Sequence, residues 1–199
     1  MPDFYHDAIV DRSWQTLQSL NREYSFTLIG GWAAWLHTRS AKSTDIDLIV
    51  DFEELSRLRD RFQLEKNDRL KKYEIHADGF DIDIYLPHYS TTLALPAAFI
   101  LEQEAVIDGF RVPSAEALLA LKLGAWRSRR RSVKGQKDLL DIEGLLGVAR
   151  RSRFDAVLRA SGLAAEAQAT LQHALTEAQE AIRHSGRWHA PNVDRNFDR

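Results

Sequence analysis

The stretch Phe26-Thr27-Leu28-Ile29-Gly30-Gly31-Trp32-Ala33 changes character at its pair of glycines. Residues 26–29 are rich in β-forming side chains and predict a strand, and residues 32–37 predict a helix. Glycine accepts a positive φ angle and lets a ligand approach the backbone closely. At the start of a helix it also leaves N–H groups free to bind phosphate. The pair therefore predicts a strand-to-helix turn, and a phosphate site is the functional alternative to a plain tight turn.

Two strands further along the chain carry alternating aspartates. The first is predicted at 45–50 and contains Asp45 and Asp47, and the second is predicted at 79–86 and contains Asp81 and Asp83. Side chains alternate faces in a strand, so each pair of aspartates points to one side. Carboxylates this close repel one another unless a cation lies between them. If the strands are neighbours, the acids suit a two-metal phosphoryl-transfer site; the alternative is a solvent-facing strand.

The other predicted elements divide the chain into two parts. A helix over 4–23, a helix over 52–63, a strand over 73–76 and a hairpin over 104–112 complete a mixed first part. Pro113 and Ser114 open a helix that extends to Arg127, and residues 128–136 are expected to form a basic linker. Further helices are predicted at 137–149, 152–160 and 163–184. We expect an α+β protein: a small mixed β-sheet core flanked by helices over 1–112, a C-terminal helical bundle over 113–185 and a polar tail over 186–199.

The composition of the chain excludes several classes of protein. Its 199 residues include 27 basic and 29 acidic side chains, so no global positive charge indicates nucleic-acid binding. There is no cysteine, which excludes disulfides and thiolate metal sites. The first residues lack the basic start and apolar run of a signal peptide. No stretch has the length and apolar character of a membrane helix, so the sequence predicts a cytoplasmic protein.

The spacing of these motifs resembles the polymerase-β-like nucleotidyltransferase superfamily. Members carry a Gly-Gly or Gly-Ser turn, a short helix, an Asp-x-Asp strand and a third aspartate on a later strand. The helical half, with Lys122 and then Lys137-Asp138-Leu139-Leu140-Asp141-Ile142, is similar to the AbiEii and MenT-like toxin nucleotidyltransferases. Gly-Gly-Trp-Ala is shared with several lincosamide- and aminoglycoside-type nucleotidyltransferases. The resemblance covers about residues 24–145 and implies the fold and a reaction class, but no substrate.

The resemblance implies roles for the acids. Asp45 and Asp47 would bind both metal ions, or one metal ion together with the nucleotide, and the metal would be Mg²⁺ or Mn²⁺. Asp83 would be the third metal ligand or the base for an incoming hydroxyl, although Asp81 shares its face and the assignment could shift by two residues. The catalytic and metal-binding residues are therefore expected to be Asp45, Asp47 and Asp83.

Nucleotide binding is expected at the glycine turn and on the later helices. Trp32 stands where many members have serine, so the phosphate contact of that hydroxyl would fall to backbone N–H groups. Arg39 could hold a triphosphate oxygen in a bidentate manner. Lys122 would reach phosphates, with an exposed helix lysine as the equal alternative, and Asp138 could serve only as a helix-capping charge. The predicted nucleotide-binding set is Gly30, Gly31, Trp32, Arg39, Lys122, Lys137 and Asp138.

The predicted function is metal-dependent transfer of a nucleoside monophosphate from an NTP to a hydroxyl. The basic run from Arg127 to Lys134 mildly favours an RNA or tRNA end as acceptor, although a solvated linker is the commoner meaning of such a run. A protein acceptor, or an antibiotic-type small molecule as suggested by Gly-Gly-Trp-Ala, is the alternative. The alanine-rich helix over 163–184 could contact an antitoxin or form a homodimer. A catalytically inactive nucleotide-binding homologue and a purely structural α/β domain are the competing classes.

Overall fold

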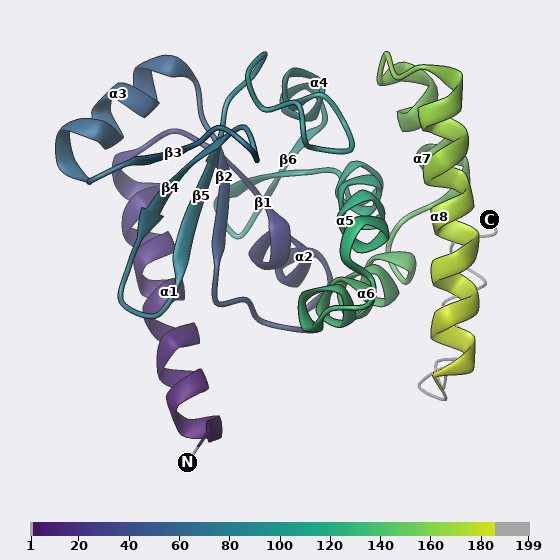
Figure 1. Cartoon of the computed structure of the whole chain (residues 1–199), viewed down its shortest axis with the longest axis horizontal. Helices are drawn as coiled ribbons and strands as arrows, with labels where there is room; N and C mark the ends of the chain where they lie inside the picture. Colours follow the sequence, from purple (N-terminus) through teal and green to yellow (C-terminus); the bar gives the residue numbers. More distant parts are fainter. Residues whose placement is uncertain (1, 186–199) are drawn as a thin grey trace.

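The computed structural model of the chain describes residues 2–185 and contains one mixed sheet, one hairpin and a set of surrounding helices (Figure 1). The strands are β1 (Thr27–Ile29), β2 (Ile46–Ile49), β3 (Glu65–Asn67), β4 (Lys72–His76), β5 (Asp81–Tyr85), β6 (Glu104–Ile107) and β7 (Phe110–Pro113). The helices are α1 (Pro2–Glu23), α2 (Gly30–Thr38), α3 (Phe52–Arg61), α4 (Ala97–Glu102), α5 (Ala115–Arg129), α6 (Val133–Leu146), α7 (Arg151–Ala160) and α8 (Ala165–His184). The α+β class is confirmed.

The order of strands in the sheet brings the two aspartate-bearing strands together. The order is β1-β2-β5-β4-β3, and β2 and β5 are parallel neighbours whereas the other pairs are antiparallel. Leu48 and Ile84 pair in register and are almost fully buried, so the apolar residues of both strands face the core. The alternation of acid and aliphatic residues in the sequence therefore becomes one polar and one apolar side of the central strands.

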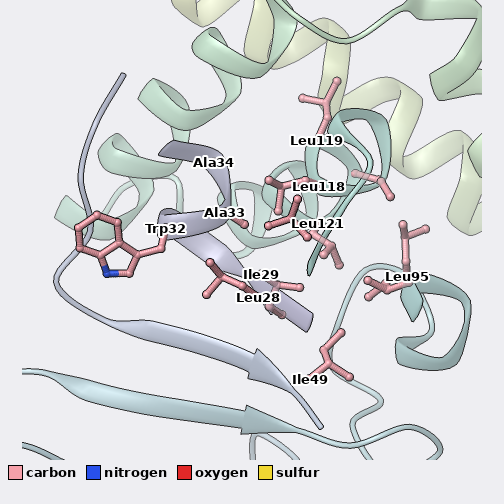
Figure 2. Packing of buried hydrophobic residues seen from close by; sticks show 14 of the residues in the cluster. Leu28, Ile29, Trp32, Ala33, Ala34, Ile49, Leu95, Leu118, Leu119 and Leu121 are labelled. Carbon is pink, nitrogen blue, oxygen red and sulfur yellow. The ribbon is translucent and has the colours of Figure 1, made fainter. Parts of the chain in front are cut away.

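Helix α2 lies between the sheet and the helices α5 and α6, and it contacts β1, β2, α5 and α6. Figure 1 shows α7 and α8 outermost, on the side of α5 and α6 away from the sheet. Leu118 and Leu121 of α5 gather with Leu28 and Ile29 of β1 in the buried cluster of Figure 2. This packing fixes α5 and α6 against the start of α2, which positions the site described below.

Local sequence signals explain the boundaries of several elements. Asp108 and Gly109 both have positive φ angles, 50° and 80°, which a two-residue turn between twisted antiparallel strands requires. The Ser114 side chain accepts a hydrogen bond from the Ala117 N–H at 3.3 Å, and the Ser132 side chain accepts one from the Gly135 N–H at 3.0 Å. These serines cap α5 and α6.

The predicted basic linker over 128–136 is wrong. Helix α5 continues to Arg129, and α6 begins at Val133 because Ser132 provides its cap. Lys137 and Asp138 consequently lie in the second turn of α6 and not at its start, so Asp138 is no capping charge. Strand β3 and helix α4 were not predicted, and α2 begins two residues earlier than expected, at Gly30 itself.

The predicted division of the chain at residue 113 stays a prediction, and the predicted tail over 186–199 lies outside the described residues. Within residues 2–185, no helix combines the length and the apolar character needed to cross a membrane.

Candidate active site

The glycine pair forms the first turn of α2 at the point where Asp47 and Ser43 approach the backbone most closely. Gly30 has a φ angle of 72°, and a Cβ there would collide with the Asp47 carboxylate. A Cβ on Gly31 would lie 2.6 Å from Ser43 Oγ. No side chain caps the start of α2, which leaves the N–H groups of its first turn available to an anion. Both glycines therefore serve close approach as well as turn formation.

Three carboxylates converge on this turn. Asp47 of β2 stands opposite Asp83 of β5 in the parallel register, and Ile29, the residue before the glycines, stands opposite Asp47 on the other side. Asp45 directly precedes β2. Asp45, Asp47 and Asp83 all line one cavity of about 550 Å³, together with Gly30 and Gly31.

The geometry separates the two candidates for the third acid. Asp81 lies at the start of β5, where its carboxylate is half exposed and is 2.8 Å from His76 Nδ1. It is not among the residues that line the cavity. Asp83, by contrast, is the direct neighbour of Asp47, so Asp83 is the better candidate.

Two lysines hold the outer acids. Lys72 Nζ lies 2.6 Å from Asp83 Oδ2 and 2.8 Å from Glu74 Oε1, and the Lys72 side chain is only 10% exposed. Lys134 Nζ lies 3.2 Å from Asp45 Oδ2, but the Lys134 side chain is 68% exposed. One lysine is thus built into the sheet, whereas the other reaches in from solvent.

The closeness of the carboxylates disfavours their ionised forms. Burial, followed by the charge of Asp47, raises the pKa of Asp83 to about 6 from an ordinary 3.8. Burial also raises the pKa of Asp47, and the charge of Asp45 adds to this effect, although nearby lysines oppose it. A cation placed between Asp45, Asp47 and Asp83 would stabilise their ionised forms.

A buried ionic network joins α5 to α6 beneath the cavity. Lys122 Nζ lies 2.7 Å from Asp141 Oδ2 and 3.4 Å from Asp138 Oδ1, and Asp138 also accepts hydrogen bonds from Arg129 at 2.8 and 3.1 Å. Burial alone would lower the pKa of Lys122, but Asp141 and Asp138 together raise it. Lys122 is therefore a fixed buried cation at the cavity wall, not an exposed helix lysine. Asp138, which the sequence predicts to bind nucleotide, pairs with Lys122 and Arg129 and holds these two side chains in place.

Lys137 reaches the glycine turn from α6. Its Nζ donates a hydrogen bond to Ser43 Oγ at 2.9 Å and would lie 3.2 Å from a Cβ on Gly31. Burial lowers the pKa of Lys137. An anionic ligand beside the Lys137 ammonium would stabilise its charged form. Of the predicted nucleotide-binding residues, Gly30, Gly31, Lys122, Lys137 and Asp138 line the cavity.

Two predicted nucleotide-binding residues lie elsewhere. Arg39 ends α2 in the left-handed region, with its guanidinium paired to Asp108 and 4.5 Å from the centre of the Trp35 ring. The indole of Trp32 is buried and donates to Ser13 Oγ at 2.9 Å. Figure 2 shows the ring on the side of α2 away from Leu118 and Leu121. Arg39 and the Trp32 side chain are therefore structural, because ion pairing and aromatic packing with Trp14 and Trp35 hold them away from the cavity.

Lys72 and Ser43 are polar residues of the cavity that the sequence motifs do not single out. The strand predicted at 73–76 began one residue too late to include Lys72. With β4 started at Lys72, alternation would have put Lys72 on the face of Glu74. Ser43 carried no signal, since a serine in a polar loop has no periodicity and its position depends on how α6 packs against α2.

The carboxylates of the cavity fit a divalent cation that substrate phosphates also bind. Among the side chains of residues 7–185, no three carboxylate or imidazole groups are placed to hold a metal ion by themselves, and lysines pair with Asp83 and Asp45. Mg²⁺ however needs only one or two carboxylates when substrate phosphates complete its ligands. Asp45 and Asp47 face the same cavity as the glycine turn and meet that condition, and the buried Oδ1 of Asp83 has no hydrogen-bond partner.

Comparisons with known proteins identify a similar fold among solved structures. No protein-family model and no curated protein matches the sequence. A solved structure described as an antigenic nucleotidyltransferase-like protein from Paracoccidioides brasiliensis matches with a TM-score of 0.52 and 17% identity, over 97% of this chain and 95% of that chain.

Two further solved structures have lower TM-scores. The Megavirus polyadenylate synthase matches with 0.46 and 14% identity, over 73% of this chain and 35% of its own. The antibiotic-resistance factor ANT(2'')-Ia matches with 0.46 and 18% identity, over 94% and 100%. At these identities the likeness concerns the fold, and the first structure alone carries that conclusion. The chain has the nucleotidyltransferase fold, in agreement with the polymerase-β-like superfamily that its Gly-Gly and Asp-x-Asp motifs resemble.

Proposed function

We propose that the protein is a metal-dependent nucleotidyltransferase that moves a nucleoside monophosphate from an NTP to a hydroxyl group. The observation that carries the proposal is the register of Asp47 beside Asp83, with Asp45 adjacent, against the uncapped glycine start of α2 in one cavity. A purely structural strand does not need a glycine at 30 to make room for a carboxylate. This close approach favours the transferase over the structural alternative.

Different residues around the cavity would bind the phosphates of the nucleotide and the metal ion. The free N–H groups at Gly30 and Gly31 and the ammonium of Lys137 would bind phosphate oxygens. Asp45 and Asp47 would hold Mg²⁺ or Mn²⁺ together with those phosphates. Such an ion, when bound, neutralises charge that develops on the phosphates during transfer. Positioning and charge neutralisation account for most of the catalysis of phosphoryl transfer.

Asp83 is suited to take the proton of the acceptor. With its pKa raised to about 6, Asp83 is mostly ionised at neutral pH yet basic enough to accept a proton. The acceptor oxygen would form a bond to the α-phosphorus while the bond from that phosphorus to the bridging α–β oxygen breaks. The hydroxyl proton passes to Asp83 and pyrophosphate leaves.

The acceptor that the surface favours is an RNA end. Residues 117–137 contain no acidic side chain, and Arg127, Arg130 and Arg131 are exposed at the end of α5. A second cavity of about 530 Å³ between α5 and α8 is lined by Arg127, Arg130 and His173, and by Glu177, whose carboxylate lies 3.0 Å from Arg130. The two cavities share Ala94, Gly124 and Ser128. Phosphates of an RNA chain could therefore follow this basic surface to the acids.

Label transfer tests the proposal. Purified protein is incubated with each α-labelled NTP and Mg²⁺, in turn with total RNA, with a protein lysate and with a panel of aminoglycosides and lincosamides. The Asp45→Asn/Asp47→Asn double variant serves as control. We expect label in RNA with the wild type alone. Label in a small molecule would instead support the antibiotic-type reading, and NTP binding without transfer to any acceptor would support an inactive homologue.

A toxin role for this activity is a separate proposal. Transfer to an RNA end that disables the RNA would make expression of the wild type harmful to a host cell and expression of the double variant harmless. Equal growth of cells that express the two proteins would remove the toxin reading and, with it, the reason to expect an antitoxin. A homodimer also remains a prediction, which the mass of the protein in solution tests.

A further inference from the structure

We propose that the ammonium group of Lys72 is a built-in cation at Asp83, so that the site binds one divalent ion, at Asp45 and Asp47, and not two. The inference rests on the proposed function, because it concerns the metal of that same site. It assigns to Lys72 a positioning task that the sequence motifs did not indicate.

The contacts of Lys72 fix its ammonium in place. β4 lies antiparallel to β5, with Glu74 directly opposite Asp83. Lys72 Nζ lies between these acids, 2.6 Å from Asp83 Oδ2 and 2.8 Å from Glu74 Oε1. The Asn67 amide in turn donates to both oxygens of Glu74, at 3.2 and 3.3 Å. The lysine is therefore held by two acids, one of which is itself held by β3.

The two lysines at the acid cluster differ in how readily they can leave. The Lys72 side chain is 10% exposed and both of its acid partners are largely buried, so its departure would leave uncompensated charge in the sheet. Lys134 is 68% exposed and its ion pair with Asp45 is open to solvent. Solvent-exposed ion pairs contribute little to stability. Lys134 can therefore give way to a metal ion at Asp45 and Asp47, whereas Lys72 stays.

A fixed ammonium at Asp83 Oδ2 opposes a second metal ion there. Two positive groups that share one carboxylate repel each other, and this repulsion is strong away from bulk water. Asp83 keeps one free oxygen, the buried Oδ1. That oxygen remains for the proton of the acceptor hydroxyl, and Lys72 supplies the positive charge that a second ion would otherwise bring.

The number of bound Mn²⁺ ions, counted by electron paramagnetic resonance with a non-hydrolysable NTP analogue present, tests the inference without any turnover. We expect one ion per wild-type chain. Lys72→Met should gain a second ion or bind Mn²⁺ at least tenfold more tightly, while Lys72→Arg should keep one. The double variant Lys72→Met/Asp83→Asn lacks both charges of the pair and should also keep one. Lys66→Met, at an exposed lysine of the neighbouring strand, is the matched control and should behave as the wild type.

Three outcomes would overturn the inference. Two equivalent ions on the wild type would refute it and leave the proposed transferase intact. An unchanged ion count and affinity in Lys72→Met would do the same. No Mn²⁺ on the wild type, even with the NTP analogue, would refute both the inference and the metal dependence of the proposed function. If Lys72→Met folds only when Mn²⁺ is present, the second ion has replaced the ammonium, which supports the inference.

Discussion

At the scale of single residues, the site depends on the lack of a side chain at Gly30 as much as on the carboxylates beside it. Gly30 combines a positive φ angle with a position at which a Cβ would collide with Asp47 Oδ2. The conformational demand and the steric demand can be separated, because Gly162 has the same φ of 72° but nothing within 4 Å of the position that a Cβ would take. The two glycines form a matched pair for substitution.

Gly30→Ala should remove label transfer almost completely, by more than 100-fold, because the methyl group displaces the Asp47 carboxylate. Gly162→Ala should lower the free energy of unfolding by roughly 1–2 kcal/mol, the usual cost of the left-handed region, without changing transfer. Denaturant unfolding and label transfer on both variants measure the two effects. If Gly30→Ala keeps full activity, Asp47 does not need its observed position.

The raised pKa of Asp83 predicts how the stability of the metal-free protein depends on pH. Between pH 4 and 6 the folded protein keeps a proton on Asp83 that the unfolded chain has released, since the folded pKa is about 6 and the ordinary value is 3.8. The free energy of unfolding should therefore fall as pH rises through this window, by an amount of order 3 kcal/mol.

Unfolding by urea at a series of pH values, with EDTA present, measures this dependence. Asp83→Asn should remove most of the fall, whereas Asp81→Asn, whose carboxylate lies outside the cavity, should keep it. The same pH dependence in the wild type and in Asp83→Asn would show that burial and the charge of Asp47 do not disfavour the Asp83 carboxylate.

At the scale of elements, the start of α6 delivers Lys134 and Lys137 to the acids and to the glycine turn. This start depends on the Ser132 cap, with the Gly135 N–H 3.0 Å from Ser132 Oγ. A Cβ on Gly135 would meet the backbone of Arg129 and Arg130, so the corner between α5 and α6 is tight. The position of the two lysines thus follows from a short turn that the sequence did not reveal.

Ser132→Ala should lower the free energy of unfolding by about 1 kcal/mol and raise the KM for NTP several-fold, because the first turn of α6 loosens. Ser114→Ala removes the corresponding cap of α5 and should cost a similar amount of stability with KM unchanged, since the first turn of α5 carries no lysine that lines the cavity. Equal KM values for the two variants would show that the α6 cap does not position the lysines.

Elements were predictable where the signal is local. The alternation in Asp-Ile-Asp, the positive-φ residues Asp108 and Gly109 and the Ser114 cap all follow from neighbouring residues, and the structure contains the corresponding elements. β3 and α4 are short and have weak periodicity. The charge pattern of the arginine run predicts a solvated linker, whereas Arg129 belongs to α5 and donates a hydrogen bond to Asp138 of α6.

At the scale of the whole molecule, the helical half completes the cavity that the sheet begins. The network of Lys122, Asp138 and Asp141 ties α5 to α6 at the cavity wall. The acids could be predicted from the sequence, because their alternating spacing lies within two single strands. It could not place Lys72, Ser43 and Arg39, because each depends on contacts between segments distant in the chain.

Lys122→Met should destabilise the fold strongly, by about 3–5 kcal/mol, because it leaves Asp141 and Asp138 buried with less compensation. Lys42→Met, at an exposed lysine just before β2, should change the free energy of unfolding by less than about 0.5 kcal/mol. Thermal or urea unfolding of the two variants gives the comparison. A small effect at Lys122 would mean that the network does not hold α5 against α6.

The role of Asp83 at the active site is tested by pyrophosphate release from NTP and acceptor RNA by the wild type, Asp83→Asn and Asp81→Asn. The two aspartates lie on the same strand face, but only Asp83 is beside Asp47 in the cavity. We expect release by the wild type and by Asp81→Asn, and a loss of at least 100-fold in Asp83→Asn. Loss in Asp81→Asn with activity retained in Asp83→Asn would contradict the placement of the active site.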